Sequence, residues 1–402
     1  MQPMRADLLT CALLLLVPVP GRCQQSQGGI PRADLERRLE EQQVLNAELL
    51  KRIERLEDAA QDRASQRASQ EGEEQCTEEC LAPHDDTLDA IDDLRHRIDL
   101  LPVLAGYFDT EYFNDNRSES PGEFRQHRLS LHLSKELDEF RVFSEVEFEY
   151  GSKFEGDGGT ALEEARGELK LEQAWGEYTR SDALVLRAGL ILTPGYWNVN
   201  HYPNVVLPTR KPLMVGSVFP ESFTGVMGYG SHYWDDLGTT YRVYAGNGES
   251  ENSAKHDDSE GKALGSGVTI HLPGGDVIER LDVGISGYAE DPLHEEKTRT
   301  WGLDAQISAG GFELLSEFAS RDSEEDRIGF YAQPSWRFDG QWAVFYRHDR
   351  LHVEAADRIA ENTIGVNYRP ISPVSLKGEV FRSERKGEST TEGIAVSFAI
   401  AF

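Results

Sequence analysis

The sequence has no apolar run long enough to form a membrane-spanning helix. Its longest apolar stretch, residues 8–19, is shorter than the roughly 20 residues that such a helix requires. Basic residues are also scarce, since 41 Lys and Arg stand against 71 Asp and Glu in 402 residues, giving a formal net charge of -30. Nucleic-acid binding depends on clusters of Lys and Arg that displace phosphate counterions. The composition therefore excludes a bundle of membrane helices and argues against a nucleic-acid-binding protein.

Cysteine is scarce as well, and two of the 4 cysteines lie in an N-terminal segment with the features of a secretory signal. There, Arg5 precedes the short apolar run, and small and turn-forming residues follow it. We therefore predict a signal peptide at residues 1–23, and hence export. The alternative, a lipid-modified Cys23, is disfavoured because Arg22 stands where a small residue normally precedes such a cysteine.

The two cysteines that export would leave are Cys76 and Cys80, in the segment QCTEEC. In an oxidising compartment such a pair is predicted to form a disulfide, within one chain or between chains. A metal site that includes His84 is the alternative, but two thiols and one imidazole fall short of the usual four zinc ligands. We predict no cofactor and no metal.

Between residues 32 and 60 the apolar residues have the spacing of a coiled coil. They recur three or four residues apart, with Gln42 and Asn46 inside the apolar seam and charged residues beside it. A single helix cannot bury such a seam by itself, so the pattern requires partner chains or packing elsewhere. A shorter helical repeat ends at Pro102. We predict a coiled-coil stalk and linker over residues 24–100; the alternative is a flexible, partly helical spacer.

After Pro102 the period changes to that of β-strands, most clearly where Ile394, Val396, Phe398 and Ile400 alternate with small or polar residues. Seven short turn-like joints punctuate this region: SKELDE, TRSDA, WDDLG, LPGGDV, AGG, FDGQ and RPISP. Eight longer polar connections alternate with them, which makes sixteen strands. Short turns that alternate with longer loops are typical of a membrane barrel. We predict an all-β fold, a 16-stranded antiparallel transmembrane β-barrel, over residues 101–402.

A soluble β-sandwich would show the same alternation in each strand, because it also has one apolar face. Charged residues between apolar neighbours favour the barrel, whose inner wall meets water while its outer wall meets lipid. The predicted lumen charges are Arg128, Arg141, Arg187, Arg242, Arg347, Glu145, Glu147 and Glu149.

Two segments resemble the trimeric outer-membrane porins. The ending IAVSFAIAF, with the aromatic Phe402, is similar to the C-terminal strand that the bacterial barrel-assembly machinery recognises. The segment EQAWGEYTRSDALVLRAGLILTPGYWNVNHYPNVVLPTRKP resembles the phosphate-selective porin O/P family and dicarboxylate-type porins, some of which carry an N-terminal coiled coil. The resemblance implies a homotrimer in contact with the lipid of the Gram-negative outer membrane, with its stalk in the periplasm.

The longest connection, residues 193–222, is the third of the eight long ones, and in porins this loop narrows the pore. It contains five prolines and many apolar residues, which suit packing against an inner wall. Arg210 and Lys211, with His201 nearby, are the predicted pore constriction, opposed within the loop by Glu221. Because such cations favour anions, we predict a preference for small anions such as phosphate or carboxylates. The alternative is that the lumen arginines pair with the lumen glutamates and leave little net selectivity.

The predicted function is therefore passive diffusion of small hydrophilic solutes rather than catalysis. One alternative is a tether whose coiled coil is the functional part and whose barrel is only an anchor. A less favoured one is a barrel hydrolase, because several histidines lie on or near strands but no G-x-S-x-G motif accompanies them. We predict no catalytic residues.

Overall fold

The computed structural model describes residues 101–402, apart from residues 118–121, 152–166, 236, 251, 253, 255, 258, 259, 276, 293–296 and 355–357. The predicted signal peptide at 1–23 and the predicted stalk at 24–100 lie outside the described residues. So do the disulfide candidates Cys76 and Cys80. In the part of the chain that is described, no helix is long and apolar enough to cross a membrane.

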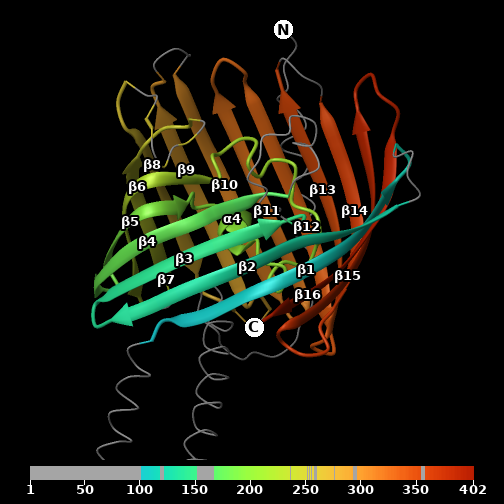
Figure 1. The fold of residues 1–402 in the computed structure, drawn as a ribbon, viewed down its shortest axis with the longest axis horizontal. Helices are drawn as coiled ribbons and strands as arrows, with labels where there is room; N and C mark the ends of the chain where they lie inside the picture. Colours follow the sequence, from blue (N-terminus) through green and yellow to red (C-terminus); the bar gives the residue numbers. More distant parts are fainter. Residues whose placement is uncertain are drawn as a thin grey trace, which may run out of the picture.

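Sixteen strands form one closed antiparallel barrel (Figure 1). They are β1 (Val103–Asp115), β2 (Glu123–Leu137), β3 (Phe140–Glu149), β4 (Leu169–Ser181), β5 (Leu184–Leu192), β6 (Ser222–Trp234), β7 (Leu237–Gly246), β8 (Ala263–Leu272), β9 (Arg280–Glu290), β10 (Thr298–Ala309), β11 (Phe312–Asp322), β12 (Arg327–Phe338), β13 (Trp342–Val353), β14 (Ile359–Tyr368), β15 (Val374–Arg385) and β16 (Thr391–Ala401). Each strand pairs with its sequence neighbours, and β1 pairs with β16. The predicted 16-stranded antiparallel barrel is confirmed.

The side-chain pattern of the strands is that of a barrel with lipid outside. On β16, Val396 and Phe398 are exposed on the outer face, whereas Ala395, Ser397 and Ala399 are buried on the inner face. Large apolar residues are exposed in the same way around the outer wall, which a water-soluble protein avoids over so large an area. All the described strands belong to one sheet, so the alternative of a β-sandwich, which requires a second sheet, does not apply.

The two ends of the barrel differ in their connections. At one end, the short-turn end, tight turns join each even-numbered strand to the strand that follows it, from β2 and β3 to β14 and β15. Asp138, Asp235 and Asp339 adopt positive φ in three of these turns, a conformation that Asp tolerates better than most residues. Trp342 and Tyr368 stack at this end with 4.3 Å between their ring centroids, as part of the aromatic belt expected where lipid meets water. The long connections lie at the opposite end, the long-loop end.

The seam between β1 and β16 closes the barrel. The Gly106 N–H donates to the Phe402 carbonyl at 2.9 Å, and the Phe402 N–H donates to the Gly106 carbonyl at 2.9 Å. From Tyr107 paired with Ala401, the register continues to Asp115 paired with Gly393. In lipid, every one of these backbone groups needs a partner within the protein.

We expect deletion of Phe402 to lower the temperature at which the barrel unfolds, because both backbone groups of Gly106 lose their partners. Heat-modifiable mobility on a detergent gel measures this temperature. Phe402→Leu is the matched control, because it keeps the backbone pair and should unfold closer to the wild-type temperature than the deletion does. An identical temperature for the deletion and the wild type would contradict this account of the seam.

Candidate functional site

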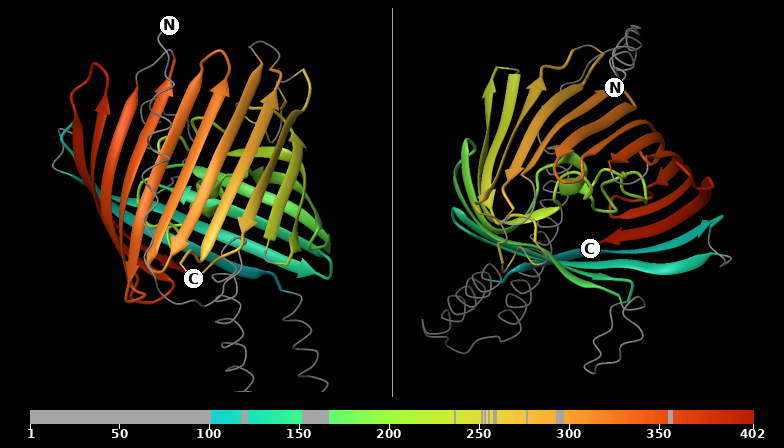
Figure 2. Two further views of the ribbon diagram at one scale, coloured as in Figure 1. Left: turned by 180° about the vertical axis from the view of Figure 1, so that it is seen from behind. Right: turned by 90° about the horizontal axis from the view of Figure 1, so that it is seen from above.

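Residues 193–221 connect β5 to β6 and form the loop named L3, which lies inside the ring of strands (Figure 2). L3 contains one short helix, α4 (Tyr196–Asn200). Its apolar residues pack on the inner wall, where Met214 and Val218 form a buried cluster with Leu315 and Tyr331. Most of the apolar residues of this connection therefore pack against strands and are shielded from water.

Glu317 on β11 holds the start of α4. Its carboxylate accepts hydrogen bonds from the backbone N–H groups of Tyr196 and Trp197, both at 3.1 Å, and from the Tyr331 hydroxyl at 2.6 Å. The residue before the helix, Gly195, provides no side-chain cap, so a wall carboxylate satisfies these two N–H groups instead. The position of α4 is thus set by the barrel.

Wall side chains also hold the middle of L3 through its backbone. Four of its carbonyls accept hydrogen bonds from the wall: Val205 from Arg369 (2.8 Å), Leu207 from Asn367 (3.0 Å), Pro208 from Lys377 (2.9 Å) and Arg210 from Arg347 (2.7 Å). The N–H groups of Thr209 and Arg210 donate to Glu379 at 2.9 and 3.3 Å. Because this segment has no regular secondary structure, the wall supplies the partners that its backbone needs.

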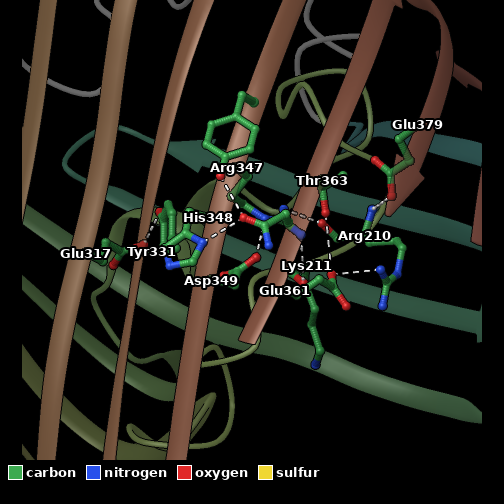
Figure 3. A network of polar contacts seen from close by, with 12 residues as sticks. Arg210, Lys211, Glu317, Tyr331, Arg347, His348, Asp349, Glu361, Thr363 and Glu379 are labelled. Carbon is green, nitrogen blue, oxygen red and sulfur yellow. Dashed lines mark hydrogen bonds and ion pairs between the residues drawn. The ribbon is translucent and has the colours of Figure 1, made fainter. Parts of the chain in front are cut away.

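Arg210 lies where L3 meets β14 and β15 (Figure 3). Its Nη1 is 2.7 Å from Glu361 Oε1, and its guanidinium lies 3.8 Å from the ring centroid of Phe381. The backbone on both sides of its side chain is held, since Arg347 also donates to the Lys211 carbonyl at 3.4 Å. Arg210 therefore presents its charge from a fixed position.

Lys211 and Glu221 form an ion pair within L3. Lys211 Nζ is 2.8 Å from Glu221 Oε1, and Lys170 of β4 lies 3.7 Å from the other carboxylate oxygen. Burial acts to raise the pKa of Glu221, but the hydrogen bond and charge of Lys211 outweigh it and hold that pKa below its ordinary value. Glu221 is consequently ionised at neutral pH, so it opposes Lys211 with a full negative charge.

His201 follows α4 and is partly buried. Its Nδ1 lies 2.8 Å from the Asn198 carbonyl, and its ring stacks on Tyr202 with 4.6 Å between centroids. Burial lowers the pKa of His201, although the nearby Glu145 acts in the opposite direction. Since the ordinary pKa of histidine is about 6.5, the ring is neutral at pH 7. The positive charge of the predicted constriction at neutral pH therefore comes from Arg210 and Lys211.

Arg347 is a fully buried side chain of β13 that contacts L3 (Figure 3). Its Nε donates to Asp349 Oδ2 at 2.6 Å, while its other nitrogens reach the two L3 carbonyls. A planar guanidinium can bind a carboxylate and two carbonyls at once in this way. Arg347 therefore connects the wall to L3 and is shielded from the lumen water.

The predicted acids Glu145 and Glu147 are buried on β3. Glu145 Oε1 lies 3.0 Å from His132 Nε2, and Glu147 accepts a 2.5 Å hydrogen bond from the Tyr107 hydroxyl. Arg128 Nε lies 3.6 Å from Glu147 Oε1, so here a predicted lumen arginine pairs with a predicted lumen glutamate. Both acids thus have partners on neighbouring strands.

Arg141 and Arg187 lie near the short-turn end, on either side of Trp175. Their guanidinium carbons are 5.7 and 3.8 Å from the centroid of that ring, within the range of a cation–π interaction. Arg187 Nη2 also lies 2.6 Å from Glu177, an acid of β4 that sequence reasoning did not single out. Both cations line the inner wall.

The remaining predicted lumen charges are Arg242 and Glu149. Arg242, on β7, lies against Gly267 of β8, where a Cβ atom would approach its Nε to 2.7 Å. Glycine thus makes room for this arginine. Glu149 is the last residue of β3, at the long-loop end, and is partly buried.

Sequence reasoning did not single out most of the wall residues that hold L3: Glu317, Asp349, Glu361, Asn367, Arg369, Lys377 and Glu379. The strand residues among them occupy inward positions of the alternating pattern, and that signal was present in the sequence. Among the described residues, no group of three or more His, Cys, Asp or Glu side chains is placed to hold a metal ion.

A closed barrel of sixteen strands with its third long loop packed inside is the architecture of a porin. Comparison with solved structures agrees. The barrel is similar to an anion-selective porin from Comamonas acidovorans (TM-score 0.53, 14% identity), covering 75% of this chain and 99% of that one. It is also similar to the outer membrane channel DcaP of Acinetobacter baumannii (TM-score 0.53, 12% identity), covering 75% and 97%. The predicted resemblance to outer-membrane porins is confirmed at the level of the fold.

Sequence comparison adds less. No family model matches the chain. An uncharacterized protein of Aquifex aeolicus (strain VF5) is 28% identical over 179 residues, which is 44% of this chain and 37% of that protein. The match thus spans little more than a third of that relative's length.

Proposed function

We propose that this protein is an outer-membrane porin, a passive diffusion channel for small hydrophilic solutes. The observation that carries the proposal is the fixed position of L3 inside a sixteen-stranded barrel. A barrel of this size leaves an aqueous channel unless something narrows it. L3, held by wall carboxylates, arginines and a lysine, narrows it with backbone that is hydrogen-bonded to side chains of β13, β14 and β15.

We further propose a preference for anions such as phosphate or carboxylates. Most lumen cations are paired with acids, but in the ion pairs of Arg210 and Lys211 the cation is the more exposed partner. The side chain of Arg210 is 27% exposed and that of Glu361 is 2% exposed; for Lys211 and Glu221 the values are 61% and 34%. The charge that these two pairs present to the lumen water is therefore mainly positive, and the compensating acids lie behind the cations. The likeness to a porin described as anion-selective is consistent with this preference.

The remaining expectations are part of the same proposal. The resemblance to trimeric porins supports a homotrimer surrounded by outer-membrane lipid and assembled by the barrel-assembly machinery. The coiled coil predicted over residues 24–100 would then extend into the periplasm from the short-turn end, where β1 begins. It would assist trimer formation or reach toward the cell wall.

The test of this function is electrical recording from the purified full-length protein in planar lipid bilayers. Stepwise conductance increases are expected, and in a potassium chloride gradient the reversal potential should have the sign of a chloride-preferring channel. Heat-denatured protein is the control. Folded protein that produces no conductance would refute the channel, while a cation-type reversal potential would refute the anion preference alone.

A further inference from the structure

A cavity of about 330 Å³ lies between L3 and the short-turn end of the barrel. Its upper wall is L3, including Trp197 and Val206, and its sides come from β9, β10, β11, β12 and the residues after β14. This volume is at the lower end of the range of about 300–1,000 Å³ that is typical of small-molecule sites. The cavity is distinct from the surface formed by Arg210 and Lys211, neither of which lines it.

Three arginines line this cavity. Arg280 is the first residue of β9, Arg337 is the second-to-last residue of β12, and Arg369 directly follows β14. The acid that lines the cavity with them is Glu313, whose carboxylate accepts a 2.6 Å hydrogen bond from Gln306. The lining therefore has an excess of positive charge.

The three guanidinium groups are not equally committed to other partners. Arg280 is paired with Asp282, and Arg369 donates to the Val205 carbonyl and to Asn367. Arg337 makes no ion pair within the part of the chain that the structure describes, and it is exposed. Its fork of N–H donors matches the geometry of a carboxylate.

The other lining residues add an apolar surface and a hydrogen-bond acceptor to this positive charge. Trp197 and Leu315 are buried and give the cavity an apolar side. Gln333 is buried as well, and its Oε1 has no hydrogen-bond partner among the described residues. A buried acceptor without a partner is costly, and a ligand that carries a donor would satisfy it.

We propose that this cavity binds an aromatic hydroxycarboxylate, with its carboxylate on Arg337, its ring against Trp197 and Leu315, and its hydroxyl donating to Gln333. Such a molecule supplies the charge, the apolar surface and the donor that the lining requires. The inference rests on the proposed porin function in one respect only: the ligand reaches the cavity through the water-filled short-turn end. It extends that function by giving the channel an internal binding site for one class of solute, the aromatic hydroxycarboxylates.

The test is calorimetric titration of the full-length protein in detergent with 4-hydroxybenzoate. Saturable binding is expected, and Arg337→Gln should weaken it by at least tenfold, because a charge-assisted bidentate contact is lost. Arg141→Gln is the matched control: it also removes one inward arginine near the short-turn end, but outside the cavity. Its affinity should stay within about twofold of wild type.

Gln333→Leu provides a second readout that a general charge effect would not change. It should abolish the preference for 4-hydroxybenzoate over benzoate while leaving benzoate binding in place. Absence of binding to the wild type, or equal losses in Arg337→Gln and Arg141→Gln, would overturn the proposal. Bilayer conductance of the same preparation separates the two ideas, since a conducting protein that does not bind 4-hydroxybenzoate refutes the site and not the channel.

Discussion

Replacing Arg347 with alanine is expected to raise the single-channel conductance severalfold and to make the current unsteady. Arg347 donates to the carbonyls of Arg210 and Lys211 and pairs with the buried Asp349. The substitution removes both L3 contacts and leaves a buried carboxylate unpaired, a change that costs about 3–5 kcal/mol in comparable buried pairs. Detachment of L3 from β13 relieves that cost by admitting water, and it widens the passage.

The measurement is single-channel recording, with heat-modifiable mobility on gels to show that the variant barrel is folded. Arg242→Ala is the matched control, since it removes another inward strand arginine, and one with no hydrogen bond or ion pair to L3 among the described residues. It should conduct nearly as the wild type does. Arg347→Lys should give an intermediate conductance, because an ammonium cannot reproduce the planar fork. A folded Arg347→Ala barrel with wild-type conductance would show that L3 is held without this residue.

The double substitution Arg210→Glu with Lys211→Glu is expected to change the reversal potential from anion preference to cation preference. It removes the two cations of the predicted constriction and adds carboxylates beside Glu361 and Glu221, the acids that now pair with them. Charges in a narrow passage act with little screening, so this reversal of sign should dominate the selectivity.

The neutral pair Arg210→Gln with Lys211→Gln is the control that separates charge from loop movement. It should shift the reversal potential in the same direction but less far. Conductance recorded in parallel reports any displacement of L3 caused by repulsion from Glu361. A reversal potential unchanged by the glutamate variant would show that these residues lie outside the narrowest part of the pore.

The strands could be predicted because the signals that define them are local. On β10, the outward Trp301 and Leu303 alternate with Gly302 and Asp304, so a short window of sequence indicates both the strand and its two faces. The alternation of short and long connections gave the strand number for the same reason. Lipid outside and water inside impose this pattern on each strand separately, and no knowledge of its neighbours is needed.

The organisation of the site could not be predicted, because it depends on distant parts of the chain. Arg210 and Glu361 are separated by 151 positions, and Trp197 and Glu317 by 120. Alternation shows that Glu361 and Glu317 face inward, but it does not show at what height they lie or which part of L3 reaches them. Pairs of this kind depend on the strand register together with the path of a loop that has almost no regular structure.

The paired backbone groups of Gly106 and Phe402 have a consequence for folding. Fourteen of the barrel's strands pair only with strands adjacent in sequence, whereas the ring closes through residues almost the whole described chain apart. Loop-closure entropy makes such a contact late and slow to form, so hairpins joined by the short turns form first. Until the ring closes, β1 and β16 are two unpaired edges that could join strands of other molecules. The interval before closure is therefore the time when this chain is most prone to aggregate and most in need of a chaperone.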